Sequence, residues 1–547
     1  MTFRSRASVL TRLLPLLAAL LVLPFLTSPA QADPDGSGDQ GDPAAVTTPQ
    51  EVAEEALAAV EEIIEAAPEL TTDAPADGLR PAGKDLTLAL RDLSVSQADL
   101  PKGKRAAAAR LLARPTDTSS ECFNDQDLAC YGARPDKVEC NAAVCVHWVE
   151  EGPHRIPTEN DDAGGSWAGS NPAIPDYVEF TLNTMKTVAT KYVGAGYRPV
   201  VSDGGADGTP QMDIYLGQLG NVGAYGYCTI DDNSISAHVP AAAYCVLDND
   251  FAEFGVSPRL ALRATAAHEY FHAVQFAYDV NEDAWLMEAT ATWAEDEVYD
   301  TINDNWNYLP FGSLAIPTQS LDIFNDLGQY GNWIFFRFLS ERYPSAQGGM
   351  STVVLDIWKR TPTQYSVQAI RNALALRNTT VPTQFALFTV WNRRPSTYYD
   401  EGSAYKASPI RAGYRLTPAN PKKVVSVRLD HLAYSTYRFT RPATGAQQRL
   451  SVKLNLNSLS TGGAAVVTTK VKGYLPTSKV VTLNSNGDGA PNFPFRLNME
   501  WVDVTVINAS TRYSGCGDPD RDATYTCQGF ALDDERLQTI SVRAYRG

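Results

Sequence analysis

One pentapeptide, His268-Glu269-Tyr270-Phe271-His272, places the strongest constraint on how this chain can fold. On an α-helix, residues four positions apart lie on one face, so the two imidazoles can bind a single metal ion. The glutamate between them would then face the water that the metal polarises. The chain contains six histidines in 547 residues, and two of them fall in this motif. The pattern predicts a zinc-bearing helix, the alternative being an ordinary amphipathic helix with satisfied histidines.

The residues that follow the motif predict a third ligand. No proline or glycine interrupts the chain from Arg259 to Tyr278, and a second helix is expected from Trp285 to about Tyr299. The polar segment 279–283 between them is short, which favours two antiparallel helices. This packing would bring Glu288 back toward the two histidines, so Glu288 is the predicted third ligand.

Other residues compete for the third position. In metzincins the third ligand is a histidine six positions after the second, but Tyr278 stands there, which excludes that class. The carboxylates of the run 295–297 are closer competitors because they lie on the same helix as Glu288. Glu288 is preferred since its neighbours are apolar and aromatic, whereas 295–297 has the charge density of a solvated helix end. Glu295 remains a candidate hydrogen-bond partner for a ligating histidine.

The stretch from Thr265 to Phe276, together with 285–298, resembles a family of secreted bacterial metalloproteases of the gluzincin type. In gluzincins the paired histidines and the later glutamate bind zinc. The resemblance therefore implies one catalytic zinc ion held by His268, His272 and Glu288. Its specific part covers about thirty-five residues, and a looser likeness spans about 146–391. The gap to the glutamate is shorter than in the best-known gluzincins, and the flanking residues read Glu-Ala-Thr-Ala.

The same resemblance implies a mechanism of peptide hydrolysis. Zinc would lower the pKa of its bound water and polarise the scissile carbonyl, while Glu269 as general base passes a proton to the leaving amine. In gluzincins a tyrosine or histidine from a later helix stabilises the oxyanion, and Tyr330 is the candidate here. Because the chain has 25 tyrosines, Tyr330 can equally be a packing residue.

The N-terminus is typical of a secretory signal peptide over residues 1–32. Arginines precede an uncharged run from Leu13 to Leu26, and small residues lead to Ala30-Gln31-Ala32. This run is too short for a comfortable membrane span, so stable membrane insertion after cleavage is not expected, although retention as an anchor is the alternative. The mature protein is predicted to be secreted and extracellular.

Eight cysteines in an exported chain predict disulfides, although sequence alone allows 105 connectivities. The rival interpretation, a cysteine zinc site, lacks a Cys-x-x-Cys pair and conflicts with an oxidising compartment. Their clustering predicts the pairs Cys122–Cys130, Cys140–Cys145, Cys228–Cys245 and Cys516–Cys527.

Composition bounds the partners and the number of folded parts. The formal net charge of −17, with no basic run beyond the leader, argues against nucleic acid as a partner. The expected partner, a peptide or protein substrate, is what the resemblance to metalloproteases implies. The length exceeds what one hydrophobic core normally supports. We expect an α+β protein with a zincin-like catalytic domain (119–414) followed by an all-β sandwich (415–547).

Residues 33–118 are predicted to form an N-terminal extension or pro-segment of low complexity and helical character. Residues 33–49 are rich in Asp, Gly and Pro, and 50–66 are rich in Glu and Ala. Basic sites at 102–105 and 110–114 look exposed and are candidates for processing.

The predicted catalytic domain combines a mixed sheet with a helical subdomain. Strands are expected at 211–216 and 242–247, with Cys228–Cys245 stapling their ends. Zincin catalytic domains place an edge strand along the cleft to pair with substrate, and one of these two strands is the candidate. Helices are expected at 176–193, 330–342, 352–359, 367–376 and 382–392.

From about residue 416 the chain changes to short alternating runs separated by Gly, Asn and Pro, which favours a β-sandwich. Strands are expected at 424–429, 452–456 and 502–506. The segment 484–489 faintly resembles a calcium loop, but a simple turn is the stronger interpretation.

Two functions are compatible with these features. The first is a secreted zinc-dependent peptidase, a metallohydrolase of the gluzincin type. The second is a non-catalytic exported binding protein that uses its β-sandwich on a degenerate protease scaffold. The intact set of His268, Glu269, His272 and Glu288 argues against degeneration.

Overall fold

The computed structural model describes residues 48–70, 86–117, 128–158, 167, 169–231, 238–325, 327–443, 448–517 and 524–546. The predicted leader and the Asp-, Gly- and Pro-rich segment up to residue 47 lie outside these described residues. Residues 46–547 form one compact unit. Its architecture is mixed α+β with a β-rich C-terminal region, as expected from the sequence.

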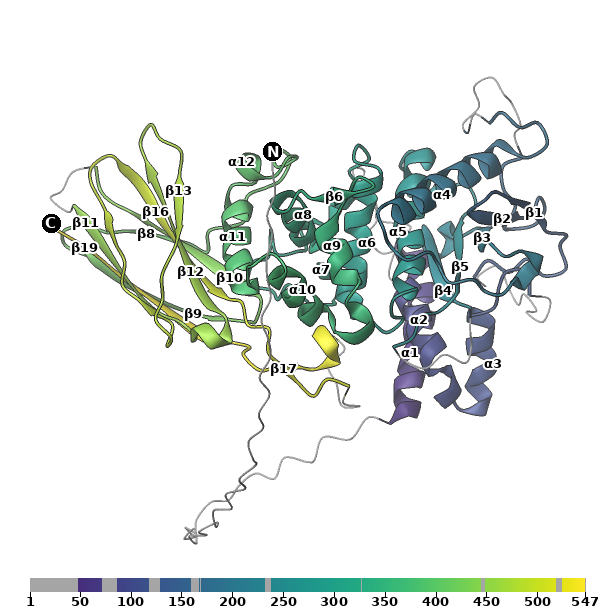
Figure 1. Ribbon diagram of the computed structural model, residues 1–547, viewed down its shortest axis with the longest axis horizontal. Helices are drawn as coiled ribbons and strands as arrows, with labels where there is room; N and C mark the ends of the chain where they lie inside the picture. Colours follow the sequence, from purple (N-terminus) through teal and green to yellow (C-terminus); the bar gives the residue numbers. More distant parts are fainter. Residues whose placement is uncertain are drawn as a thin grey trace, which may run out of the picture. The chain divides into compact units, whose positions relative to one another are not determined.

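The described residues of the N-terminal region include three α-helices, which confirms the predicted helical character (Figure 1, purple to blue). These are α1 (Pro49–Leu70), α2 (Leu86–Ser96) and α3 (Lys102–Leu111). Apolar residues at helical spacing, such as Ala53 and Leu57 of α1, pack against Leu86, Leu90 and Leu93 of α2. The basic site at 102–105 is exposed and lies in the first turns of α3.

A five-stranded sheet follows, with strand order β1-β2-β3-β5-β4. Strands β2, β3 and β5 run parallel, whereas β1 and β4 are antiparallel to their neighbours. The strands are β1 (Lys137–Cys140), β2 (Val144–Trp148), β3 (Met212–Gly217), β4 (Gly226–Ile230) and β5 (Ala243–Asp248).

The predicted strands 211–216 and 242–247 are confirmed as β3 and β5, but the prediction that one of them is the edge strand beside the cleft is wrong. Both lie inside the sheet, whose two edges are β1 and β4. The sequence analysis did not identify β4, a strand of five residues that are all buried. The chain returns from β4 and inserts β5 between β4 and β3.

The two faces of the sheet carry different side chains. In β3, Ile214 and Leu216 point to the face covered by α4 (Asp176–Gly194) and α5 (Pro258–Phe276), while Tyr215 points to the opposite face. The three N-terminal helices cover that opposite face, where Tyr215, Tyr227 and Tyr244 gather. The sheet is therefore a central layer between two sets of helices (Figure 1).

The helical part after the sheet matches the predicted elements. Residues predicted as one helix at 330–342 divide at Asn332 into α7 and α8. The helices are α6 (Ala284–Val298), α7 (Gly328–Gly331), α8 (Trp333–Arg342), α9 (Thr352–Trp358), α10 (Ser366–Ala375), α11 (Val381–Arg393) and α12 (Pro395–Tyr398). None of the helices in the described part of the chain is long and apolar enough to cross a membrane.

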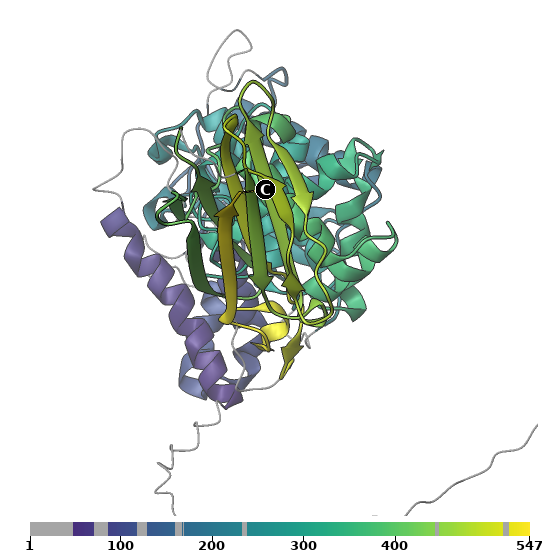
Figure 2. The ribbon, with the colours of Figure 1, turned by 90° about the vertical axis from the view of Figure 1, so that its left-hand side faces the viewer.

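The β-rich C-terminal region consists of two sheets packed face to face, as expected for a sandwich (Figure 2). One sheet has the order β13-β12-β16-β10-β8, and the other has β14-β11-β19-β9 with β15 beside β11. The strands are β8 (Ala412–Arg415), β9 (Lys422–Leu429), β10 (Ala433–Thr440), β11 (Arg449–Asn455), β12 (Gly463–Val471), β13 (Thr477–Val480), β14 (Asp488–Gly489), β15 (Asn492–Pro494), β16 (Met499–Asn508) and β19 (Arg536–Tyr545).

The weak calcium-loop pattern at 484–489 corresponds to a turn. The side-chain oxygen of Asn484 accepts hydrogen bonds from the backbone N–H groups of Asn486 and Asp488, so it closes the turn itself. Calcium binding there stays a prediction that these contacts do not favour.

Three of the four predicted disulfides are confirmed. They join Cys140 to Cys145, Cys228 to Cys245, and Cys516 to Cys527. The Cys228–Cys245 bridge links β4 to β5 rather than β3 to β5. The fourth predicted pair includes Cys122, which lies outside the described residues.

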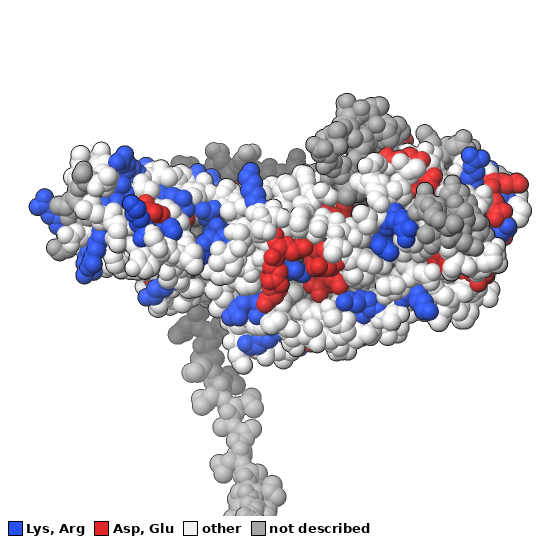
Figure 3. All heavy atoms as spheres, turned by 90° about the horizontal axis from the view of Figure 1, so that it is seen from above, with Lys and Arg blue, Asp and Glu red and all other residues white. Residues whose placement is uncertain are grey.

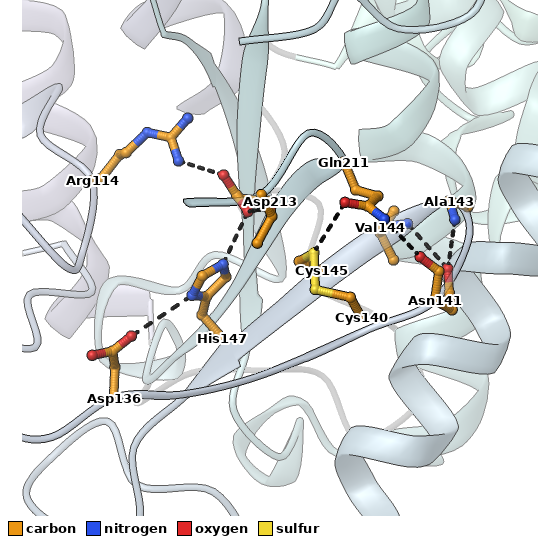
Figure 4. The surroundings of a disulfide bond; sticks show 11 residues. Arg114, Asp136, Cys140, Asn141, Ala143, Val144, Cys145, His147, Gln211 and Asp213 are labelled. Carbon is orange, nitrogen blue, oxygen red and sulfur yellow. Dashed lines mark hydrogen bonds and ion pairs between the residues drawn. A yellow bond between two sulfur atoms is a disulfide. The ribbon is translucent and has the colours of Figure 1, made fainter. Parts of the chain in front are cut away.

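Arg114, at the end of the N-terminal helices, is anchored to the sheet. It forms ion pairs at 2.7, 2.5 and 2.6 Å with Asp203, Asp213 and Asp231. Figure 4 shows Arg114 and His147 both pointing toward Asp213. Burial by itself would raise the pKa of Asp213, but the hydrogen bonds from His147 and Arg114 lower it. The predicted processing site at 110–114 therefore ends in a nearly buried side chain, 11% exposed, rather than an exposed one.

Charges are unevenly distributed over the surface. On the face drawn in Figure 3, a large group of acidic side chains lies near the middle and others lie toward the end away from the sandwich, while the sandwich end carries mostly basic ones. The net charge of −17 is therefore not a uniform property of the surface.

A buried histidine joins the sandwich to the helical part. His431 Nε2 lies 2.7 Å from Asp322 Oδ1, and its Nδ1 contacts Asp534. Because both ring nitrogens face carboxylates, the ring is held as an imidazolium. Burial by itself would lower the pKa of His431, but the charge of Asp322 and the hydrogen bonds to both carboxylates raise it to about 10.

This arrangement predicts how stability depends on pH. The folded pKa of His431 lies above the unfolded value of about 6.5, so its contribution is complete below pH 6.5 and is lost as pH rises toward 10. The loss cannot exceed about 1.4 kcal/mol per pH unit from one group. Melting temperatures measured from pH 6 to 10 should fall, and His431→Gln should flatten the slope. The matched variant His238→Gln, at a half-exposed histidine, should retain the pH slope of the wild type. Equal slopes in all three proteins would contradict the role of the His431 imidazolium.

Candidate metal centre

Helix α5 carries the two histidines of the motif on one buried face. His268 and His272 are fully buried, and their ring centroids are 4.8 Å apart. The helix begins at Pro258 and runs unbroken to Phe276, which covers most of the stretch 259–278 that the sequence showed to be free of proline and glycine. Gly226 of β4 allows close packing here, because a Cβ at that position would lie 2.8 Å from the side chain of Thr265.

Helix α6 brings Glu288 to the histidine pair. The short connection after α5 turns the chain back, and the two helices pack against each other (Figure 1). Glu288 Oε2 lies 3.2 Å from His268 Nε2, and Glu288 Oε1 lies 3.5 Å from His272 Nε2. The carboxylate is fully buried. The structure thus brings together the three side chains that the sequence singled out as ligands.

The donor atoms have the spacing that a tetrahedral zinc site requires. With bond lengths near 2.1 Å, neighbouring ligand atoms around tetrahedral zinc are about 3.4 Å apart. The two nitrogen–oxygen distances bracket this value, and the possible ligand atoms of all three residues lie within 4.8 Å of one another. Two imidazole nitrogens and one carboxylate oxygen form a donor set suited to zinc.

Two further side chains orient the imidazoles. Glu295 Oε1 lies 2.6 Å from His268 Nδ1, and Gln275 Oε1 lies 2.7 Å from His272 Nδ1. Gln275 Nε2 donates to the carbonyl of Met287, which fixes the amide so that its oxygen faces the ring. Each Nδ1 therefore donates a hydrogen bond, and each Nε2 presents a lone pair to the candidate metal position.

The role of Glu295 as a partner of a ligating histidine was foreseen, whereas Gln275 was used only as a position on the helix. Its position three residues after His272, on the same face, is the signal that could have identified it.

The expectation that 295–297 is a solvated helix end is wrong. Glu295 and Asp296 are each 3% exposed. Asp296 pairs with Arg337 at 2.9 Å instead of approaching the histidines. Burial raises the pKa of Asp296 to about 7 despite the opposing charge of Arg337. Asp296 and Glu297 thus form ion pairs with Arg337 of α8, at 2.9 and 3.6 Å, which the sequence could not show.

Glu269 is held by the N-terminal helices. Thr87 of α2 donates its hydroxyl hydrogen to Glu269 Oε2 at 2.8 Å. The same hydroxyl oxygen accepts the backbone N–H of Cys228 in β4 at 3.0 Å. Glu269 is only 1% exposed. No sequence signal pointed to Thr87, because it lies 182 residues from Glu269.

Tyr330 lies close to the candidate metal centre. Its ring centroid is 6.3 Å from that of His268 and 5.1 Å from that of Tyr308. Tyr330 is fully buried in α7. Its position is compatible both with packing and with donation to an oxyanion, so its catalytic role stays a prediction.

A cavity of about 280 Å³ lies along the half of α5 that precedes His268. Its lining is mainly apolar and includes Tyr308, which also contacts Tyr330. The lining residues are Tyr225, Val256, Ser257, Leu260, Ala261, Ala264, Thr265, Ile302, Asp304 and Tyr308. Thr265 stands one helical turn before His268, so the cavity adjoins the candidate centre.

Comparisons with known proteins leave the family open. No protein-family model and no curated protein matches the chain. Among solved structures, the pre-peptidase C-terminal domain of a collagenase from Bacillus anthracis is 12% identical, with a TM-score of 0.16, over 25% of this chain and 97% of that one. A surface-associated copper-binding protein of Methylomicrobium album BG8 is 11% identical, with a TM-score of 0.15, over 25% and 98%.

A family 115 4-O-methyl-alpha-glucuronidase is 8% identical over 55% of this chain and 46% of that one, with a TM-score of 0.13. Scores this low carry no argument about fold or function.

The hydrogen bond from His268 to Glu295 predicts a change in metal affinity. Glu295→Ala should weaken zinc binding about 10- to 100-fold, because the His268 ring loses the group that sets its tautomer and orientation. Competition with a zinc chelator measures the dissociation constant. Glu297→Ala on the same helix is the matched control and should bind zinc as the wild type does. Equal affinity in both variants would show that Glu295 does not support the site.

Proposed function

We propose that the chain is a secreted zinc-dependent peptidase of the gluzincin type, with a zincin-like catalytic domain. The observation that carries this proposal is the buried group of His268, His272 and Glu288. The Nε2 atoms of the two histidines lie 3.2 and 3.5 Å from the carboxylate oxygens of Glu288. When bound there, zinc would supply an activated water and a Lewis acid for a carbonyl oxygen.

Glu269 is the proposed general base. It stands next to His268 on α5, and its carboxylate already accepts a hydrogen bond from a hydroxyl group at 2.8 Å. A water molecule in the position of that hydroxyl could give its proton to Glu269 Oε2. Glu269 would then pass the proton to the leaving amine of the peptide. Tyr330, beside His268, is the proposed donor to the oxyanion.

The surrounding fold supports a peptide substrate. Strand β4 is the edge of the sheet and lies next to α5, so an extended peptide can pair with it. The cavity before His268 is apolar and can take an apolar side chain next to the scissile bond. The three disulfides support export to an oxidising compartment.

Substitution of the proposed base separates catalysis from metal binding. Glu269→Gln should retain one zinc ion per chain but lose at least a hundredfold in kcat/KM on a peptide library, because the amide cannot accept the proton. His272→Ala and Glu288→Ala should lose the zinc itself, measured by elemental analysis.

The alternative function, a non-catalytic protein that binds through its β-sandwich, makes the opposite prediction. In that case Glu269→Gln would leave every measured activity unchanged even though the wild type binds zinc. A wild-type protein that binds no zinc after reconstitution would contradict the metal centre itself.

The cavity predicts a substrate preference. Ala264→Phe should fill much of the 280 Å³ and lower kcat/KM at least tenfold for peptides with Leu or Phe beside the scissile bond, relative to peptides with Ala. Zinc content should remain one per chain, which serves as the control for folding. An unchanged preference would place the substrate side chain elsewhere.

A further inference from the structure

We infer that the N-terminal helix α2 is an autoinhibitory element that occupies the substrate cleft of the proposed peptidase. This inference rests on the proposed function and adds the regulation of the same site. Three observations carry it: the contacts of Thr87, the burial of the centre, and the way in which the N-terminal helices are attached to the sheet.

Thr87 occupies the position that two reactants would need. Its hydroxyl donates to Glu269, the proposed base, at 2.8 Å and accepts from the N–H of Cys228 at 3.0 Å. A catalytic water would need the first of these partners, and the carbonyl of an extended substrate would need the second. With α2 in place, neither partner is available.

The N–H of Cys228 belongs to the outer side of the edge strand. Cys228 and Cys245 are paired residues of β4 and β5, with their Cα atoms 4.0 Å apart. Such a short distance marks a non-hydrogen-bonded pair in an antiparallel ladder, so this N–H points away from β5. An edge strand with an outward N–H can bind an added strand, and α2 covers that position.

The proposed centre is closed to solvent in this arrangement. His268, His272 and Glu288 are 0% exposed, and Glu269 is 1% exposed. Thr87 itself is fully buried. A peptide therefore cannot reach Glu269 until a covering element moves, and α2 is the covering element that contacts this side chain.

Helix α2 packs through Leu86, Leu90 and Leu93 in the N-terminal hydrophobic cluster and makes polar contacts through Arg91. Arg91 donates to the carbonyl of Glu282 at 3.0 Å and contacts the sulfur of Met287 at 3.1 Å. The sheet face beneath the N-terminal helices carries Tyr215, Tyr227 and Tyr244, whereas the opposite face is mainly aliphatic. Tyrosine has a polar end that water can satisfy, so this face is the one better suited to uncovering.

The test uses the full-length exported protein and substitutions on α2. Thr87→Val keeps the side-chain shape but removes both hydrogen bonds, and Arg91→Ala removes a second contact of α2. Thr389→Val, in the buried helix α11, is the matched control because its hydroxyl only donates to the backbone of its own helix. Two rates are measured: hydrolysis of quenched fluorescent peptides, and transfer of bound zinc to the chelator 4-(2-pyridylazo)resorcinol.

We expect Thr87→Val and Arg91→Ala each to raise kcat/KM and the rate of zinc transfer at least tenfold, with Thr389→Val unchanged. Lower peptide hydrolysis in Thr87→Val would overturn the inference, because Thr87 would then assist catalysis. Unchanged rates in both α2 variants of a protein that cleaves peptides would also overturn it, and the proposed peptidase would stand. Faster zinc transfer without any peptide cleavage would support the covering role of α2 and refute the peptidase.

Discussion

The buried carboxylate of Glu288 between two imidazoles is the contact on which the arrangement of this molecule depends. A carboxylate with 0% exposure is costly to bury unless a positive charge compensates it. The ring nitrogens of His268 and His272 lie 3.2 and 3.5 Å from its oxygens, and the proposed zinc ion held among these three side chains would supply that charge. Holding those atoms together requires α5 and α6 to pack antiparallel at close range. Gln275 contributes from within the first helix, because it contacts the ring of His272 and the backbone of α6.

The elements around this helix pair hold it from both ends of the chain. The C-terminal region reaches the start of α6, where Asp283 accepts hydrogen bonds from the backbone N–H groups of Ser366 at 3.0 Å and Cys527 at 2.6 Å. The Cys516–Cys527 disulfide closes the loop that makes this contact. The sandwich is therefore not a separate appendage, since its loop fixes the helix that carries Glu288.

The N-terminal helices pack on the opposite side of the sheet, in a separate hydrophobic cluster. Arg114, at their end, forms ion pairs with three aspartates, and Thr87 of α2 donates a hydrogen bond to the side chain of Glu269. The composition of this segment is compatible with a simple extension, but its helix α2 contacts Glu269, the proposed general base. The sheet face under the N-terminal helices carries tyrosines, whereas the face under α4 and α5 carries mainly aliphatic residues. This contrast is consistent with N-terminal helices that can move away and with α4 and α5 that stay in place.

The sequence by itself determined the local features, because helix periodicity and motif spacing are properties of neighbouring residues. It predicted α5, α6, the ligand-type residues with Glu295 behind them, the sandwich strands and three confirmed disulfides. Only the tertiary structure decided that β4 is the edge strand, that Asp296 pairs with Arg337, and that Thr87 reaches Glu269. These features depend on contacts between residues that are distant in the chain, and the spacing of neighbouring residues in a sequence does not show which distant segments meet.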